Sequence, residues 1–347
     1  MSELRQNLAT KEWVIIATER AKRPDQFKSK KAKKSLPEYD PSCPFCPGNE
    51  INTPGETCRI SDEKGWIVRS YPNKFPALME KGERKRRIKG VERWLNGVGM
   101  HEVIAESRLH NLTTALLPQD NIKLILQVYR KRYQDLCGDN RFEMIIIFKN
   151  HGKGAGTSIE HPHSQLIATP LVPTQVRHRL EEAMRYFDDT GECAYCKILR
   201  EELGHKTRIV FESKHFVSFV LYAALSPFHN WIIPKRHMPS FGEISDEEIE
   251  DLAFALKNVL ARYYYGLDDP DFNYVIRSAP VGGGANEYYH WYLSIVPRLT
   301  KTAGFELGSG MFINVSVPEE DAKFLRNVKI PESNVVKNGP RKQRKTK

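Results

Sequence analysis

Residues 159–170 read IEHPHSQLIATP, in which two histidines and a glutamine alternate with other residues at the start of an apolar run. Successive side chains of a β-strand point to opposite faces of the sheet, so residues two apart share a face. If the strand already begins there, His161, His163 and Gln165 line up on one side of it. Three polar groups on one face of a strand indicate a common chemical task or exposure to water.

One order of signals occurs twice along the chain. Each half shows a CxxC pair, strand-like runs, a lone histidine, a helix, another strand and a last strand led by a histidine. A shared order at a long period indicates a duplicated unit. We expect an α+β fold of two half-barrel-like units, each a mostly antiparallel sheet with helices on one face. The expected strands are residues 13–18, 66–72, 101–107, 143–150 and 164–170, then residues 215–221, 230–235, 273–278 and 290–298.

This order places a boundary between two domains, residues 1–172 and residues 173–330. The remaining residues 331–347 have no periodicity and many basic residues, so we expect a disordered basic tail. The helix of the second half is predicted to begin at a capping box, because Ser245 is followed three residues later by Glu248 and then by a helical apolar stripe.

Composition excludes several classes of protein. The chain has 347 residues, 40% of them apolar, which is enough for a sizeable core. No apolar run approaches the roughly 18 residues of a membrane helix, and the polar N-terminus is unlike a secretory signal, so we expect a cytoplasmic protein. The net charge of +10 is concentrated in residues 28–34, 81–89 and 341–347, which we interpret as solvated loops and tail. The alternative is attraction to nucleic acid or to an anionic small substrate.

Four of the six cysteines form two CxxC pairs, Cys43 with Cys46 and Cys193 with Cys196. In a chain without a secretory signal such pairs indicate metal or redox chemistry before disulfides. Each pair is matched by downstream histidines in the same order, so both halves predict a tetrahedral Cys2His2 metal site. The alternative is buried thiols with hydrogen-bonded core histidines. The four histidines are His110 and His161 in the first half, and His237 and His290 in the second.

Zinc in such a site contributes on the order of 10–16 kcal/mol, which rivals the ~5–15 kcal/mol stability of a whole domain. We therefore expect each half to depend on its metal. Cys58 and Cys137 have no matching partners and are expected to be packing residues.

With these residues in place, the chain resembles the galactose-1-phosphate uridylyltransferase family, within the histidine-triad superfamily. The resemblance covers nearly the whole chain in one order, which is far more specific than any single motif. The matching pieces are ERAKRP (19–24), CPFCPGNE (43–50), YPNKFPAL (71–78), HEVIAESRLH (101–110), FKNHGKGAGTS (148–158), HPHSQ (161–165), PFHNWIIPKRH (227–237), HWYLSIVPR (290–298) and AGFELGSGMFIN (303–314).

The resemblance implies a UDP-glucose–hexose-1-phosphate uridylyltransferase of galactose metabolism. A histidine takes UMP from UDP-glucose, releases glucose 1-phosphate and passes the UMP to galactose 1-phosphate. By position in HPHSQ, His163 is the expected nucleophile, His161 a zinc ligand and Gln165 a donor to the nucleotidyl phosphate. A neutral imidazole suits this role because it is a good nucleophile near pH 7. The metal is expected to be zinc in both sites, with iron as an alternative in one.

The resemblance also implies substrate-binding residues and a homodimer. Arg20 and Arg23 match arginines that extend toward the nucleotide of the partner subunit. A glycine-bearing turn before the catalytic strand offers N–H groups to an anion. The further expected contacts with nucleoside, phosphates or sugar are Asn73, Asn150, Gly156, Thr157, Ser158, Phe305, Glu306 and Asn314.

The second half departs from this pattern. Tyr292 occupies the position of the nucleophile, so we expect that half to be catalytically silent. His229 stands where several relatives have a glutamate metal ligand, and we weigh a surface position against a ligand role.

Three other functions stay open from the residues. The C-terminal motifs also resemble ADP-glucose phosphorylases of the same superfamily, which would use the same histidine with phosphate or sulfate as acceptor. A histidine-triad hydrolase would release the nucleotide to water. A non-catalytic zinc module would bind nucleic acid through its basic stretches, with a salt-sensitive affinity.

Overall fold

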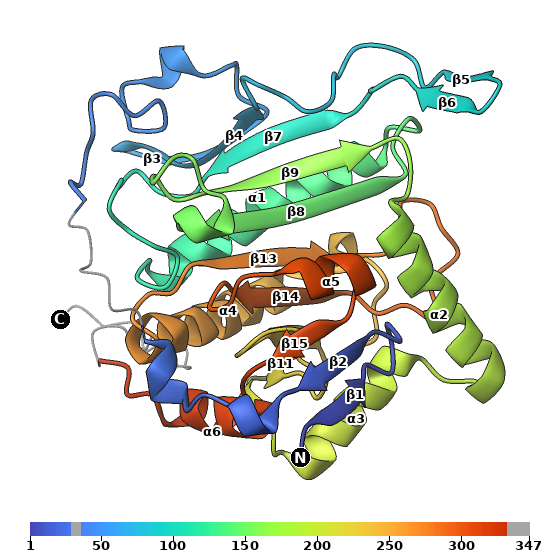
Figure 1. Ribbon diagram of the computed structural model, residues 1–347. Helices are drawn as coiled ribbons and strands as arrows, with labels where there is room; N and C mark the ends of the chain where they lie inside the picture. Colours follow the sequence, from blue (N-terminus) through green and yellow to red (C-terminus); the bar gives the residue numbers. More distant parts are fainter. Residues whose placement is uncertain (29–35, 332–347) are drawn as a thin grey trace.

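The computed structural model describes residues 1–28 and 36–331. Within this part of the chain, ten strands form one large sheet in the order β10-β11-β12-β14-β13-β8-β9-β7-β4-β3, and every neighbouring pair is antiparallel (Figure 1). The strands are β3 (Cys58–Asp62), β4 (Gly65–Pro72), β7 (Met100–Ala105), β8 (Met144–His151), β9 (His163–Thr169), β10 (Ile209–Glu212), β11 (Phe216–Val220), β12 (Asn230–Pro234), β13 (Phe272–Arg277) and β14 (Tyr292–Pro297).

The two expected units are the two halves of this sheet. Read outward from the middle, the first half runs β8-β9-β7-β4-β3 and the second runs β13-β14-β12-β11-β10, which is the same order of strands along the chain. The halves meet where β8 pairs with β13, from Phe272 opposite His151 to Ile276 opposite Ile147. The α+β class is confirmed, while a domain boundary near residue 172 stays a prediction because hydrogen bonds run continuously across the middle of the sheet.

Helices α1 (Gln119–Cys137) and α4 (Asp246–Gly266) pack against each other and cover one face of the large sheet (Figure 1). Both helices bury an apolar stripe in the main core, as their helical spacing predicts. Helix α4 begins at the predicted capping box, because Ser245 accepts from the Glu248 N–H while Glu248 accepts from the Ser245 N–H.

The remaining elements lie at the edges and on the opposite face. Strands β1 (Glu3–Gln6), β2 (Trp13–Ile16) and β15 (Phe312–Asn314) form a small sheet that lies over the second half (Figure 1). The sequence did not predict β1, β3, β10, β15 or the hairpin of β5 (Arg86–Lys89) and β6 (Glu92–Leu95). For residues 81–89, which include β5, we expected a solvated loop. The other helices are α2 (Thr174–Thr190), α3 (Ala194–His205), α5 (Gly304–Ser309) and α6 (Pro318–Asn327), with 3-10 turns η1 (Thr18–Arg20), η2 (Pro24–Phe27), η3 (Glu50–Asn52), η4 (Lys153–Ala155) and η5 (Phe241–Glu243).

Two of the basic segments fall largely outside the described residues: most of 28–34, and the tail from residue 332. Across the described ranges, the helices are all too short or too polar to pass through a lipid bilayer.

The strand register relates individual residues of the two halves. Val103 lies opposite Gln165 in β7–β9, and Trp231 lies opposite Ser294 at the matching position of β12–β14. On the other side of these strands, Gln165 is paired with Phe148 in β8–β9, and Ser294 is paired with Val275 in β13–β14. Counting along the strands from these anchors gives the equivalent pairs His163 and Tyr292, Gln165 and Ser294, His101 and His229, Lys149 and Ile276, and Asn150 and Arg277.

Candidate active site and metal clusters

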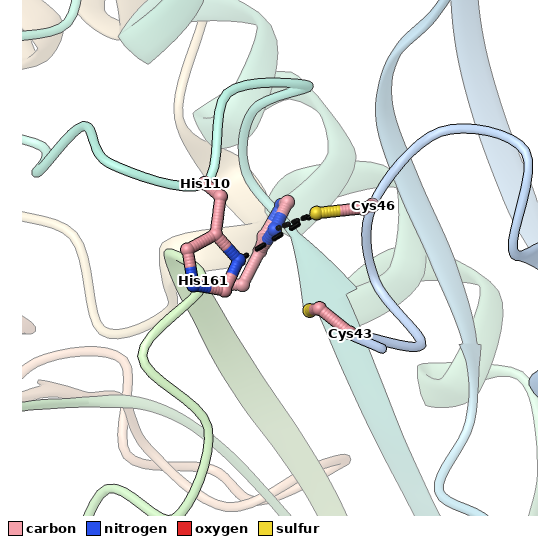
Figure 2. A group of neighbouring side chains, drawn as sticks. All are labelled: Cys43, Cys46, His110 and His161. Carbon is pink, nitrogen blue, oxygen red and sulfur yellow. Dashed lines mark hydrogen bonds between the residues drawn. The ribbon is translucent and has the colours of Figure 1, made fainter. Parts of the chain in front are cut away.

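Cys43, Cys46, His110 and His161 come together as the sequence predicts (Figure 2). The cysteines lie in the loop before η3, His110 follows β7, and His161 lies two residues before the start of β9. All four side chains are buried, and their ligand atoms lie within 4.8 Å of one another. The Cys46 Sγ atom is 3.5 Å from Nδ1 of His110 and 3.6 Å from Nδ1 of His161.

These distances fit a tetrahedral metal ion. Zn–S bonds of ~2.3 Å and Zn–N bonds of ~2.0–2.1 Å at tetrahedral angles give a sulfur–nitrogen separation of about 3.5 Å. His161 also has the hydrogen bond that orients a metal-binding imidazole, because its Nε2–H donates to the Ser107 carbonyl at 2.7 Å and leaves Nδ1 for the metal.

Cys193, Cys196, His237 and His290 form an equivalent group in the second half. Cys196 Sγ lies 3.2 Å from Nδ1 of His237 and 3.4 Å from Nδ1 of His290. The Nε2–H of His237 donates to the Asn286 carbonyl at 2.7 Å. Among the described residues, Cys58 and Cys137 belong to neither group and pack against the main core, as predicted.

His163 is the first residue of β9 and is 8% exposed. Its Nδ1–H donates to the His161 carbonyl at 2.8 Å, so Nε2 carries the lone pair. Burial lowers the pKa of His163 from its ordinary value, although the bond to His161 opposes that shift. The Phe45 ring meets the imidazole edge to face at 5.3 Å. A neutral imidazole whose Nδ1 is tied to the backbone is therefore set two residues beyond His161 of the Cys2His2 group.

A buried ion pair, which no sequence pattern predicted, lies behind this histidine. Lys149 Nζ donates to Glu106 Oε2 at 2.5 Å and to the His163 carbonyl at 3.2 Å. Burial alone would raise the pKa of Glu106, but Lys149, with help from a bond to Thr114, holds it below its ordinary value. Lys149 thus fixes the backbone of the histidine strand from the helix-covered side.

Gln165 meets a residue that the sequence analysis missed. Its Oε1 lies 2.7 Å from Nε2 of His101, whose Nδ1 accepts from the Ala77 N–H at 3.1 Å. Asn73, expected to contact substrate, places its Nδ2 3.3 Å from the same His101 nitrogen. A signal for His101 was present, because the histidine pair 101 and 110 recurs in the second half as 229 and 237.

The glycine-bearing turn lies next to Asn150. Gly152 and Gly156 have φ of +82° and +91°, and a Cβ on Gly152 would stand 1.9 Å from Asp271 Oδ1. Thr157 Oγ1 donates to the Asn150 carbonyl. Asn273 Nδ2 donates to Asn150 Oδ1 at 2.8 Å, so the Asn150 NH2 group is turned the other way. Ser158 is exposed.

The other residues expected to contact substrate lie near β15 and on α5, away from His163 in the sequence. Exposed Arg20 and Arg23 flank the backbone bond from the Lys22 N–H to the Val315 carbonyl, next to β15 and over the second half. Phe305 is 49% exposed on α5, and Glu306 accepts from the Ala303 N–H at the start of that helix.

Asn314 is fully buried, and its amide donates to the Ala224 carbonyl at 3.0 Å. The substrate roles of these residues stay predictions, and for Asn314 the structure gives internal partners.

The expectation for His229 was wrong in both forms. The side chain is 4% exposed, so it is not a surface residue, and within the described residues it is outside the second Cys/His group. Its Nε2 lies 2.9 Å from Ser294 Oγ. Tyr292, at the position equivalent to His163, is 1% exposed and stacks on Trp231 with ring centroids 4.0 Å apart.

The large antiparallel sheet is thus duplicated, and a Cys2His2 group lies beside a buried histidine whose Nε2 can act as a nucleophile, an arrangement that suits an enzyme acting through that histidine. Family models described as the N-terminal and C-terminal domains of galactose-1-phosphate uridyl transferase match residues 1–173 and 179–328. The chain belongs to this galactose-1-phosphate uridyl transferase family.

The chain is similar both to an ADP-glucose phosphorylase and to uridylyltransferases. An ADP-glucose phosphorylase of Arabidopsis thaliana is 38% identical over 333 residues, 94% of this chain and 93% of the relative. A galactose-1-phosphate uridylyltransferase of Thermotoga maritima is 29% identical, over 95% of this chain and 99% of the relative. A solved structure of an ADP-glucose phosphorylase from Arabidopsis thaliana with bound ADP-glucose is 35% identical, with a TM-score of 0.81 over 95% of this chain and all of that one. A uridylyltransferase structure is 27% identical, with a TM-score of 0.72 over 94% of this chain and 97% of that one.

Proposed function

We propose that this enzyme is a UDP-glucose–hexose-1-phosphate uridylyltransferase that carries UMP on His163. The observation that carries the proposal is the bond from His163 Nδ1–H to the His161 carbonyl, because it leaves Nε2 as a free nucleophilic nitrogen. Membership of the galactose-1-phosphate uridyl transferase family supports this choice of reaction.

The reaction is a double displacement. Nε2 of His163 attacks the α-phosphorus of UDP-glucose, a P–N bond forms, and the P–O bond to glucose 1-phosphate breaks. A phosphate oxygen of galactose 1-phosphate then attacks the same phosphorus, which breaks the P–N bond and returns the neutral imidazole. Both steps build negative charge on the α-phosphoryl oxygens, and donors aimed at those oxygens speed the reaction. Gln165 and Asn150 supply amide donors. The N–H groups of Ala155, Gly156 and Thr157 already donate to the carbonyls of Gly152 and Lys153 within the turn, so the turn shapes the site rather than supplying these donors.

Each Cys2His2 group is proposed to hold zinc, with iron as the alternative in the second. The ion would be held by two thiolates and two imidazoles, leaving no open position for substrate, so its contribution is structural. In the first half it would fix His161, and through the chain the position of His163.

ADP-glucose phosphorolysis is the second candidate. It is favoured by the 38% identity to the Arabidopsis thaliana phosphorylase, against 29% to the Thermotoga maritima uridylyltransferase. The chemistry at His163 is the same, with AMP in place of UMP and phosphate as acceptor.

Two further proposals concern the oligomeric state of the enzyme and its place in the cell. Arg20 and Arg23 lie over the second half of the sheet, whereas His163 lies in the first, so we propose a homodimer in which these arginines serve the partner's site. A cytoplasmic location suits thiols that must stay reduced to bind metal.

The test is mass spectrometry of the intact protein after mixing with UDP-glucose, and separately with ADP-glucose. We expect a UMP-sized adduct on a peptide containing His163, discharged by galactose 1-phosphate. If only an AMP adduct forms and phosphate discharges it, the enzyme is an ADP-glucose phosphorylase and not a uridylyltransferase. Discharge by water alone would indicate a hydrolase. No adduct, together with nucleic-acid binding that survives His163→Ala, would indicate a binding module.

A further inference from the structure

We propose that His101 is a positioning residue that turns the amide of Gln165 so that its NH2 group faces the transferred phosphoryl group. The proposal rests on the proposed function, because it assigns a task to a neighbour of the phosphate-binding side chain. His101 heads the matching piece 101–110, but the sequence pattern assigns it no role, and it belongs to neither Cys/His group.

The protonation of His101 follows from its two hydrogen bonds. A backbone N–H can only donate, and the Ala77 N–H points at Nδ1 over 3.1 Å. Nδ1 therefore carries the lone pair, and the proton of the neutral ring is on Nε2. That nitrogen lies 2.7 Å from the Gln165 side chain, so the atom facing it must be the acceptor, Oε1.

The orientation of Gln165 is then determined. With Oε1 accepting from His101, the amide NH2 is directed away from His101. Asn73 does not compete for the His101 proton, because its own Oδ1 accepts from the Phe75 N–H at 2.9 Å and its NH2 faces Nε2. Without His101, the Gln165 amide could rotate by half a turn and bring its oxygen to the phosphate, where it would repel the developing charge.

His101 is itself held in place. The ring is 9% exposed on β7, and the Asn73 N–H donates to the His101 carbonyl at 2.7 Å. The segment from Asn73 to Ala77, which follows β4, is thus fastened to both the backbone and the ring of this histidine. The amide of Gln165 therefore meets a fixed donor rather than a mobile one.

The second half contains the same device without the amide. His229, equivalent to His101, accepts at Nδ1 from the Leu225 N–H at 3.4 Å, and Leu225 follows β11 as Ala77 follows β4. Its Nε2 lies 2.9 Å from Ser294, which is equivalent to Gln165. The histidine and its backbone donor thus occur in both units, whereas the amide that would meet a phosphate occurs in one. His229 provides a matched control.

The experiment compares the single-turnover rate of adduct formation in four variants of the metal-loaded full chain: His101→Phe, Gln165→Ala, the double variant, and His229→Phe. We expect His101→Phe to slow the step by about 10- to 100-fold, less than the ~10²–10³-fold loss of a whole oxyanion donor. Because His101 acts through Gln165, His101→Phe should cause no further loss in the Gln165→Ala background. His101→Gln, which restores a donor, should recover part of the rate, and His229→Phe should leave the rate of the folded fraction unchanged.

A second measurement keeps this proposal separate from the proposed function. In ¹⁵N-labelled protein without nucleotide, we expect His101 to show a protonated Nε2, and His101→Phe to shift and broaden the Gln165 amide signals. Additive losses in the double variant, or unchanged Gln165 signals in His101→Phe, would overturn the positioning role. Failure of the wild-type protein to form any adduct would instead overturn the proposed function, and the amide signals would still decide the question for His101.

Discussion

The two halves of the large sheet share strand order, a Cys2His2 group and a histidine that accepts from a backbone N–H. They differ in the side chains at a few equivalent positions of the strands. Where the first half has His163, the second has Tyr292, stacked on Trp231 and fully inside the core. Lys149, which supports the His163 carbonyl, is matched by Ile276.

The comparison separates features shared by both halves, which we assign to folding, from side chains found in the first half, which we assign to catalysis. Both halves keep a Cys2His2 group and the sheet, so we assign these features to the stability of the unit. At the equivalent positions compared above, the first half has an imidazole, an amide and a buried lysine where the second has Tyr292, Ser294 and Ile276, so these are the residues on which chemistry is expected to depend. The following variants test that division, from the largest expected effect to the smallest.

The largest difference in activity is expected between a variant at the proposed nucleophile and a variant at the equivalent position of the second half. We expect His163→Ala to lower nucleotidyl transfer by roughly 10⁴-fold or more and to abolish the adduct, because no covalent intermediate can form. The measurement is steady-state transfer together with intact mass. Tyr292→Phe, the equivalent position, is the control and should retain activity. Comparable losses in both variants would show that the second half also takes part in the reaction.

Removing one ligand from each metal group should destabilise both variants but inactivate one. Cys43→Ser and Cys193→Ser should each lose one metal equivalent and several kcal/mol of stability, a share of the ~10–16 kcal/mol of a structural zinc site. Only Cys43→Ser should also inactivate the folded fraction, because His161 is two residues from His163. Metal analysis, thermal unfolding and activity are measured together. Cys58→Ser should change none of the three; a Cys193→Ser protein that is folded but inactive would contradict the division.

Breaking the buried ion pair tests the support behind His163. Lys149→Ile, which copies Ile276 of the second half, leaves the fully buried Glu106 carboxylate without its cation. We expect a loss of about 3–5 kcal/mol in the free energy of unfolding, measured with denaturant. Adding Glu106→Gln should restore much of that loss, because the neutral amide needs no cation. Thr114 and Tyr129 donate to different Glu106 oxygens, so the amide oxygen can accept from one hydroxyl while the NH2 group donates to the other. A double variant no more stable than Lys149→Ile would contradict this account.

The smallest effect concerns pH and belongs to the second half, on which α6 packs. Asp321 in α6 is fully buried, and burial raises its pKa from 3.8 to about 7, opposed by bonds from Ser316 and Phe228. The folded state thus holds a proton that the unfolded state releases, so stability should fall as pH rises from about 4 to about 7.

The expected loss between pH 5 and pH 7 is about 2 kcal/mol, measured by denaturant unfolding. Asp321→Asn should remove this part of the pH dependence. A wild-type protein whose stability follows the same pH profile as the variant would show that Asp321 is not the responsible group.

Local patterns were enough to predict much of the site. The two CxxC pairs and the downstream histidines in matching order led to both Cys/His groups, because residue type and order along the chain are visible in the sequence. The strands and the α4 capping box were also readable, since each depends on a few neighbouring residues. The hairpin at 86–95 was missed because a charged run hides the alternation of an exposed pair of strands.

The sequence by itself determined the duplicated unit, the residues of the two metal groups and the histidine proposed as nucleophile. Only the tertiary structure decided that the halves share one sheet, that His101 meets Gln165, that Lys149 supports His163, and that His229 is buried away from the metal group. Those contacts depend on strand register and on hydrogen bonds between residues far apart in the chain, as with the 64 positions between His101 and Gln165. A local pattern determines the face of the strand on which a side chain lies, but the residue that it contacts on that face depends on how distant segments pack.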